Sequence, residues 1–322
     1  MGFFLWDRWH QLKGMGVLGM NRRNHHYIGR YNDRSLYPLV DNKLNTKQLA
    51  LEFGVSTPKL IAVVDNQHDV PRVGIILGKH KGFCIKPAKG SGGKGILVIT
   101  ESRLADDGQQ LQFCKPSGEW VGLAYVQRHI SNILAGLFSL GGATDVAMVE
   151  TLLVPNKELA AFSFQGVPDI RVIVFRGIPV MAMMRLACAA SHGKANLHQG
   201  AIGVGLDIHS GEAVHAVQND HRIELHPDTD IELNSLFVPH WDELLELSMA
   251  CQEISGLGYL GVDLVIDQHE GPTLLELNAR PGLSIQIANN AGLIPRLSAI
   301  ESLNKPELMS REAKLAYARE HF

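Results

Sequence analysis

A stretch near the end of the chain, LLELNARPG at residues 274–282, places three different polar side chains at alternate positions among apolar residues. Side chains at every second position of an extended chain share one face, so Glu276, Asn278 and Arg280 project together. The opposite face is apolar and consists of Leu275, Leu277 and Ala279. An ordinary half-buried strand carries interchangeable polar residues. A carboxylate, an amide and a guanidinium in register indicate a binding or catalytic site.

The preceding segment, GVDLVID at 261–267, supplies a partner for this stretch. If the turn is centred between His269 and Glu270, Asp263 lies directly across from Glu276, with Cβ atoms about 4.5–5.5 Å apart. Two facing carboxylates repel each other unless a positive charge lies between them. With the amide oxygen of Asn278 they form an all-oxygen set that suits Mg²⁺. The alternative is a solvated acidic edge, which the apolar residues flanking the acids make less favourable.

A glycine-rich stretch, KPAKGSGGKG at 86–95, is the second candidate. It contains a formal G-x-G-x-x-G pattern, but the dinucleotide-binding form needs a following helix, and ILVIT reads as a strand. A P-loop would need Ser or Thr after Lys94, where the chain has Gly95. What remains is a hairpin loop whose backbone N–H groups could cover phosphates, with Lys86 paired to them. The alternative is a flexible surface hairpin.

A third group follows an apolar strand that ends in Arg185. Its guanidinium suits phosphate or carboxylate ligands, and Asn196, in the loop SHGKANLHQGA, can orient a polar group. His198 in the same loop is either a ligand or a structural histidine. Asp169 and Arg171 share a strand face, where they could form a structural ion pair.

The elements that must position these residues mix helices with hairpins. Helices are predicted at 44–53, 122–138 and 241–256, with glycine stops at Gly54 and Gly256. Strands are predicted on both sides of the glycine-rich loop within 82–99, at 145–155, and in two hairpins at 169–187 and 258–280. This mixture predicts an α+β fold with antiparallel sheets.

The composition excludes several classes of protein. The 322 residues are 45% hydrophobic and 20% charged, with a net charge of −3, so nothing global indicates nucleic-acid binding. The cysteines are widely spaced without a C-x-x-C pair, which predicts reduced core residues and a cytoplasmic location. They are Cys84, Cys114, Cys188 and Cys251.

The first 20 residues are apolar and basic, but charged residues interrupt them and no signal-peptide cleavage site follows. The aromatic cluster of Phe3, Phe4, Trp6 and Trp9 could contact a membrane surface, or it could pack against the rest of the protein. No run reaches the roughly 18 apolar residues of a transmembrane helix.

Six segments in order resemble the ATP-grasp superfamily, and specifically the RimK-like alpha-L-glutamate ligase-like proteins. They are KPAKGSGGKGI, VETLLV, DIRVIVFRGIPVMAMMR, ANLHQGA, GVDLVID and LLELNARPGL, and they span roughly residues 41–287. The resemblance implies two α+β subdomains that sandwich ATP. Residues 1–55 would form a short N-terminal segment, 56–150 the lid subdomain with the glycine-rich loop, and 151–322 the subdomain with the metal site.

The resemblance also implies roles for individual residues. Lys86 would bind the α- and β-phosphates under a lid formed by Gly90, Ser91, Gly92, Gly93, Lys94 and Gly95. The adenine hinge would be Glu150, Thr151 and Leu152, with Glu158 as the ribose-binding acid. Two Mg²⁺ ions, for which Mn²⁺ could substitute, would be held by Asp263, Glu276 and Asn278.

The remaining implied roles concern the substrate and the transferred phosphoryl group. Arg185 and Asn196 would face the γ-phosphate and the substrate, and Arg280 would steady the phosphoryl group. The assigned substrate-binding residues are Asp169, Arg171 and His198.

The reaction implied is the joining of a carboxylate to an amine, through an acyl phosphate made from ATP. The substrate would be glutamate, another amino acid or a peptide. Two alternatives stay open: an ATP-grasp kinase that phosphorylates a small molecule, and a non-catalytic ATP-binding partner protein.

Overall fold

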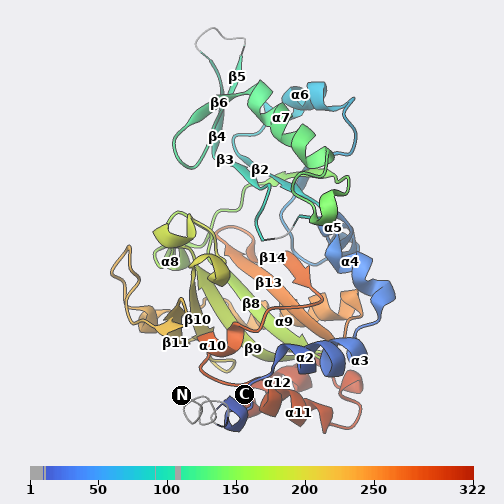
Figure 1. The fold of residues 1–322 in the computed structure, drawn as a ribbon, viewed down its shortest axis with the longest axis vertical. Helices are drawn as coiled ribbons and strands as arrows, with labels where there is room; N and C mark the ends of the chain where they lie inside the picture. Colours follow the sequence, from blue (N-terminus) through green and yellow to red (C-terminus); the bar gives the residue numbers. More distant parts are fainter. Residues whose placement is uncertain (1–9, 11, 91, 106–109) are drawn as a thin grey trace, which may run out of the picture. The chain divides into compact units, whose positions relative to one another are not determined.

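The computed structural model describes residues 10, 12–90, 92–105 and 110–322, and these fold into two compact units (Figure 1). Unit 1 contains residues up to 41 together with 49–56 and 155–322, and unit 2 contains 42–48 and 57–154. The predicted cluster of aromatic residues at the N-terminus lies outside the described residues.

Unit 1 is built on a seven-stranded antiparallel sheet in the order β12-β11-β10-β9-β8-β13-β14. Its strands are β8 Asp169–Phe175, β9 Ile178–Leu186, β10 Ile202–Leu206, β11 Ala213–Gln218, β12 His221–Arg222, β13 Tyr259–Asp267 and β14 Gly271–Asn278. The central strands read as nearly continuous apolar runs because they are buried on both faces.

Helices of unit 1 pack against this sheet (Figure 1). Helix α9, Trp241–Ser255, contacts β8, β9, β13 and β14, and it ends at Gly256, whose left-handed backbone (φ 67°) favours glycine. Helix α12, Arg311–His321, contacts α9 and β9. Unit 1 also contains α8 Lys157–Ala160, α10 Ile285–Ala288 and α11 Ile294–Glu301.

The N-terminal segment of unit 1 is helical and packs against the end of β8 and the start of β13, at Phe175 and Tyr259. It comprises α2 Met20–Arg22, a π-helix Arg23–Ile28, α3 Gly29–Tyr31 and α4 Tyr37–Asp41. Tyr27 and Tyr31 meet Phe175 edge-to-face, at centroid distances of 5.6 and 4.8 Å. The Asn32 amide bonds to the backbone N–H and carbonyl of Tyr259 (2.8 Å each) and to the carbonyl of Ala279 (3.2 Å). This segment therefore holds the end of β14.

Unit 2 contains a four-stranded antiparallel sheet in the order β1-β7-β2-β3 and a three-stranded sheet β4-β5-β6. The strands are β1 Leu60–Val64, β2 Phe83–Pro87, β3 Leu97–Ile99, β4 Glu101–Leu104, β5 Leu111–Cys114, β6 Trp120–Gly122 and β7 Ala147–Thr151. Helix α7, Leu123–Leu134, buries Val126, Ile130 and Ile133, which share one face at helical spacing. Helix α6 is Val73–Leu77, and helix α5, Lys43–Glu52, supplies residues to both units.

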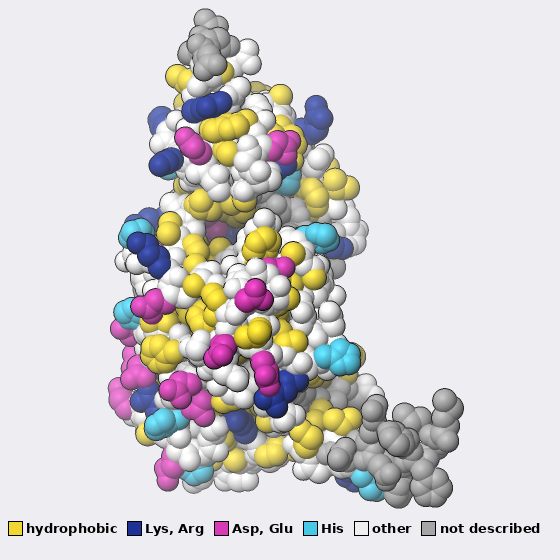
Figure 2. All heavy atoms as spheres, turned by 90° about the vertical axis from the view of Figure 1, so that its left-hand side faces the viewer, with side chains coloured by type: hydrophobic (Ala, Val, Ile, Leu, Met, Phe, Trp, Pro, Cys, Tyr) yellow, Lys and Arg dark blue, Asp and Glu magenta, His cyan; other side chains and the backbone are white. Residues whose placement is uncertain are grey.

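The predicted helices and hairpins are confirmed, except that α7 ends at Leu134 and residues 135–138 form turns; the α+β class and the antiparallel sheets are confirmed as well. No helix of the described part of the chain is long and apolar enough to cross a membrane. On the face drawn in Figure 2, the Lys and Arg side chains of the described residues are scattered over both units rather than gathered in one patch.

The hairpin β13–β14 differs from the prediction in one detail. Asp267 pairs with Gly271, so the turn is centred on His269 rather than between residues 269 and 270. The pairing of Asp263 with Glu276 is nevertheless as predicted, because an irregularity between two pairs, Leu264↔Leu274 and Asp263↔Glu276, leaves one extra residue on β14.

This bulge corrects the predicted faces of β14. Leu274, Leu277 and Ala279 are each 2% exposed and lie in the core, whereas Leu275 is only half-buried. The prediction that Leu275 shares the core face was wrong, because strict alternation fails where two residues oppose one.

Leu274→Ala should lower the free energy of unfolding by about 2–5 kcal/mol, because it leaves a cavity in the core. Leu275→Ala is the matched control on the neighbouring residue and should cost clearly less. Urea unfolding of both variants measures the difference. Equal losses would contradict the described faces of β14.

Candidate functional site

Four charged side chains lie side by side on the sheet of unit 1. Asp169 of β8 pairs in register with Arg185 of β9, and Arg171 of β8 pairs with Asp263 of β13. Because residues 169 and 171 are two apart on one strand, the four side chains share one face across three neighbouring strands. Antiparallel pairing therefore creates this charged face, which holds four of the predicted site residues.

Bidentate ion pairs connect the charged face. The Arg171 Nε and Nη2 atoms donate to Asp263 Oδ1 and Oδ2 at 2.7 and 2.6 Å. Arg185 donates through Nε and Nη2 to Asp169, the latter at 2.8 Å, and its Nη2 also lies 2.9 Å from Asp263 Oδ2. The four side chains are only 7–13% exposed. Charged groups this buried persist because each is paired and hydrogen-bonded.

The pKa values of the two aspartates are shifted in opposite directions. Burial acts to raise the pKa of Asp263, but Arg171 and Arg185 outweigh it and hold that pKa below the ordinary value. Burial raises the pKa of Asp169 to about 6. The positive charge of Arg185 acts to lower this pKa, but Arg185 also pairs with Asp263.

The other two predicted metal ligands, Glu276 and Asn278, lie on β14, the strand next to Asp263. Asp263 pairs with Glu276 across the strands, and Asn278 Nδ2 donates to Asp263 Oδ2 at 3.2 Å. The oxygen donors of Glu276, Asn278 and Asp263 match the chemistry of Mg²⁺. Both oxygens of Asp263, however, already accept bonds from guanidinium groups. Glu276 and Asn278 fit a cation, and Asp263 fits one only if an arginine contact lengthens.

No group of three or more His, Cys, Asp or Glu side chains in the described ranges is arranged to hold a metal. The predicted donor set contributes only two carboxylates to such a group, and its metal-binding role stays a prediction.

Arg280, just beyond β14, is held by the N-terminal segment. Its Nη2 donates to Asp41 Oδ2 at 2.9 Å, and its guanidinium lies 5.1 Å from the centre of the Tyr37 ring. The arginine remains 54% exposed, so its charge can still meet a ligand. Sequence reasoning missed Asp41 and Tyr37, which lie more than two hundred residues away in the chain.

Two other predicted residues of unit 1 are engaged locally. Asn196 caps a short 3-10 helix, Leu197–Gln199, by accepting the N–H of His198 at 3.1 Å. His198 is exposed. Glu158 lies exposed in the first turn of α8. The roles of these three residues stay predictions.

Unit 2 holds the predicted phosphate-binding lysine in a buried cluster. Lys86 on β2 lies 2.5 Å from Oε2 of Glu150 on β7, and Lys47 of helix α5 lies 2.6 Å from Oε1. The Glu150 side chain is 3% exposed and held by both lysines. The Glu150 side chain is thus engaged within the protein, and the hinge role of residues 150–152 stays a prediction. Lys47 was missed, because no sequence pattern connects a helix to a strand a hundred residues later.

The glycine-rich loop follows β2 and is anchored at its first glycine. The Lys43 ammonium donates to the Gly90 carbonyl at 2.6 Å, and Gly90 forms an isolated bridge with Ser139. The Asp145 carboxylate accepts the Lys89 N–H at 3.0 Å and the Ser139 hydroxyl at 2.5 Å. Ser91 lies outside the described residues.

The last glycine of the loop is anchored from helix α7 and the segment after it. His129 Nε2 donates to the Gly95 carbonyl at 2.9 Å, and burial lowers the His129 pKa. A Cβ at Gly95 would lie 2.5 Å from Phe138, and the backbone there has φ 75°. Only glycine fits this position. The anchors leave Gly92, Gly93 and Lys94 as the central part of the loop.

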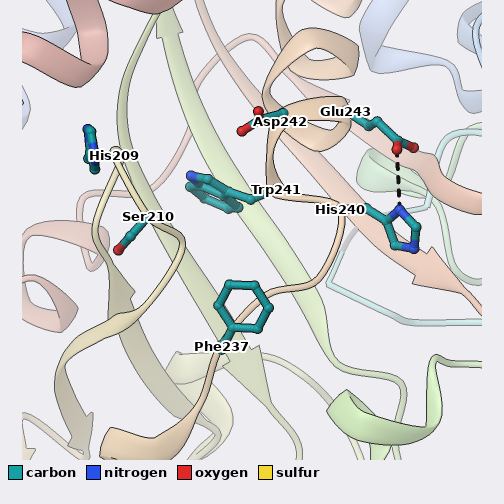
Figure 3. Close-up of a pocket in the computed structure, with 7 residues that line it drawn as sticks. All are labelled: His209, Ser210, Phe237, His240, Trp241, Asp242 and Glu243. Carbon is teal, nitrogen blue, oxygen red and sulfur yellow. Dashed lines mark hydrogen bonds and ion pairs between the residues drawn. The ribbon is translucent and has the colours of Figure 1, made fainter.

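A separate pocket of about 360 Å³ opens in unit 1 beside the start of α9 (Figure 3). Its lining residues are His209, Ser210, Phe237, His240, Trp241, Asp242 and Glu243. Trp241 Nε1 donates to the Ile208 carbonyl at 2.9 Å, and His240 lies 3.3 Å from Glu243 (Figure 3). None of the predicted site residues lines this pocket.

Comparison with known proteins gives one family. The model of the family described as "Sugar-transfer associated ATP-grasp" matches residues 22–302. No curated protein matches the chain.

Several solved structures are similar to the chain at low identity. The ATP-grasp ligase PsnB, complexed with minimal precursor, Mg and ADP, is 16% identical with a TM-score of 0.44, over 84% of this chain and 61% of that one. D-cycloserine synthetase DcsG is 16% identical (TM-score 0.42; 89% and 73% covered). D-alanyl-alanine synthetase A from Vibrio cholerae is 10% identical (TM-score 0.48; 90% and 67% covered). The chain thus spans less than two thirds of the length of PsnB.

Arg185→Met should lower the free energy of unfolding by about 3–5 kcal/mol, because it leaves Asp169 buried without its bidentate partner. Lys115→Met is the matched control: Lys115 pairs with Glu119 at 2.6 Å, but the glutamate is 57% exposed, and such surface pairs contribute less than about 1 kcal/mol. Chemical denaturation compares the two. A loss no larger than that of the control would show that the charged face is not desolvated.

Gly95→Ala should destabilise the protein more than Gly92→Ala. Both positions have positive φ, but only Gly95 also meets Phe138, whereas nothing lies within 4 Å of a Cβ at Gly92. Thermal unfolding of the two variants measures the difference, and Gly95→Ala combined with Phe138→Ala tests its cause. If removing the ring recovers none of the excess, the overlap is not responsible.

Proposed function

This chain belongs to the sugar-transfer associated ATP-grasp family, and from that premise we propose that it is an ATP- and Mg²⁺-dependent ligase that joins a carboxylate to an amine. The proposal draws on the resemblance of six sequence segments to the RimK-like glutamate ligases, and its substrate would be glutamate, another amino acid or a peptide. The confirmed part of the sequence prediction is membership of the ATP-grasp superfamily.

The observation that carries the proposal is the juxtaposition of two buried arginines with an oxygen set. Arg171 and Arg185 meet at Asp263, and Asp263 pairs in register with Glu276. Phosphoryl transfer needs cationic groups and little covalent chemistry, since catalysis comes mainly from positioning and charge stabilisation. A face rich in guanidinium and carboxylate groups suits that requirement better than it suits nucleophilic catalysis.

Separate groups would bind the nucleotide. Lys86 would pair with the α- and β-phosphates, and the N–H groups of the loop between Gly90 and Gly95 would cover them. The backbone of residues 150–152 would bind adenine. Bound Mg²⁺, held by Glu276 and Asn278 with Asp263, would neutralise phosphate charge.

The proposed reaction has two steps. The substrate carboxylate attacks the γ-phosphorus, the bond to ADP breaks, and an acyl phosphate forms. An amine then attacks the acyl carbon, phosphate leaves, and the amine proton passes to solvent. Arg185 and Arg280 would bind the oxygens of the phosphoryl group during the first step, because guanidinium groups match phosphate geometry.

One observation favours a second candidate, a protein that binds ATP without turning it over. The Asp263 carboxylate is fully engaged by arginines, and a catalytic metal would have to compete with them. The two candidates differ in whether ADP is released.

Purified protein with ATP, Mg²⁺ and the amino acids singly and in pairs, glutamate first, should release ADP and phosphate only when a carboxylate and an amine are both present. Glu276→Gln should lower turnover by about 100-fold or more, because it removes a charge that would hold the metal. Glu270→Gln, in the turn of the same hairpin, is the matched control and should retain turnover. A stable phosphorylated product would favour a kinase, and tight ATP binding without ADP release would favour the non-catalytic candidate.

Removal of divalent ions with a chelator should abolish ADP release, and added Mg²⁺ or Mn²⁺ should restore it, since both are oxygen-preferring cations. Coupled ADP detection follows the titration. Turnover that persists in excess chelator would exclude a role for Glu276 and Asn278 as metal ligands.

A further inference from the structure

The buried cluster in unit 2 contains two ammonium groups and one carboxylate. The side chains of Lys47, Lys86 and Glu150 are 4%, 11% and 3% exposed, so all three charges are largely removed from water. One lysine pairs with each oxygen of Glu150. Together the three side chains carry a charge of +1, whereas Lys86 and Glu150 alone would carry none.

Oxygens of the protein surround the Lys47 ammonium group. The Lys47 ammonium meets Glu150 Oε1, donates to Thr57 Oγ1 at 3.0 Å, and donates to the carbonyl oxygen of Pro58. Two of these contacts are hydrogen bonds and the third, to Glu150 Oε1 at 2.6 Å, is an ion pair, so three protein oxygens surround the ammonium group. Lys47 is therefore committed to the protein and is not placed to bind a ligand.

We propose that Lys47 is a positioning residue: it neutralises Glu150 so that the positive charge of Lys86 is offered to the phosphates of ATP. This inference rests on the proposed function, in which Lys86 binds ATP. Without Lys47, the charge of Glu150 would cancel that of Lys86 at 2.5 Å, and the remaining neutral pair would attract an anion weakly. The competing explanation is that Lys47 only ties helix α5 to residues 57–58.

Nucleotide affinity separates the two explanations. Binding of ATP and of adenosine to the full chain is measured by calorimetry at fixed salt. Lys47→Met should weaken ATP binding by about 10-fold, which corresponds to about 1.4 kcal/mol, and leave adenosine binding unchanged because adenosine has no phosphates. Thr57→Val is the structural control: it removes a contact of Lys47 without changing charge and should leave both affinities unchanged.

The double variant Lys47→Met with Glu150→Gln gives the sharper test. It restores the cluster charge to +1, so ATP affinity should return to within about threefold of the wild type, a difference below 1 kcal/mol. If the double variant binds ATP as weakly as Lys47→Met alone, or if Lys47→Met weakens adenosine equally, the positioning role is wrong.

Two further outcomes are distinguishable. If Lys47→Met does not fold, Glu150→Gln alone, with a cluster charge of +2, should bind ATP more tightly than the wild type, whose cluster charge is +1; equal or weaker binding would overturn the inference. If the wild type itself does not bind ATP, the proposed function fails first. If the wild type binds ATP and Lys47→Met binds it with the same affinity, only the proposed role of Lys47 is overturned.

Discussion

The pairing of β8 with β9 on one side and β13 on the other is the constraint on which the candidate site depends. It places Asp169 beside Arg185 and Arg171 beside Asp263, so that opposite charges alternate across three strands. Burial makes the alternation necessary, because any one of these charges alone would be costly to remove from water. The apolar core stabilises the paired strands, and the strand register positions the four charged side chains.

The buried charges of unit 2 do not balance, unlike those of the charged face in unit 1. On the charged face of unit 1, the two arginines and two aspartates balance. Around Glu150, two lysines share one carboxylate and leave a surplus of positive charge. A balanced network serves positioning, whereas a surplus suits attraction of an anion.

Local patterns in the sequence predicted much of this. Alternation along β8, the glycine-rich loop between two strands and the helix of residues 241–255 all follow from neighbouring residues. The pairing of Asp263 with Glu276 was also predicted, but it holds only because the bulge in β14 offsets the shifted turn. The ion pairs Arg280–Asp41 and Lys47–Glu150 join distant segments, and no periodicity marks such contacts in a single sequence. The bulge in β14 was also missed, because LLELN reads equally well as regular alternation.

The bulge at Leu275 makes the register at Glu276 independent of the length of the turn, whereas a regular hairpin would link the two. In a regular hairpin, the turn length fixes the register along both strands, so adding one residue to the turn would move every side chain of β14 to the opposite face. Here the turn is set by Asp267 and Gly271, and the extra residue resets the register before Glu276. Turn and site can therefore vary independently in evolution: a one-residue change in the turn, offset at Leu275, would leave Glu276 opposite Asp263.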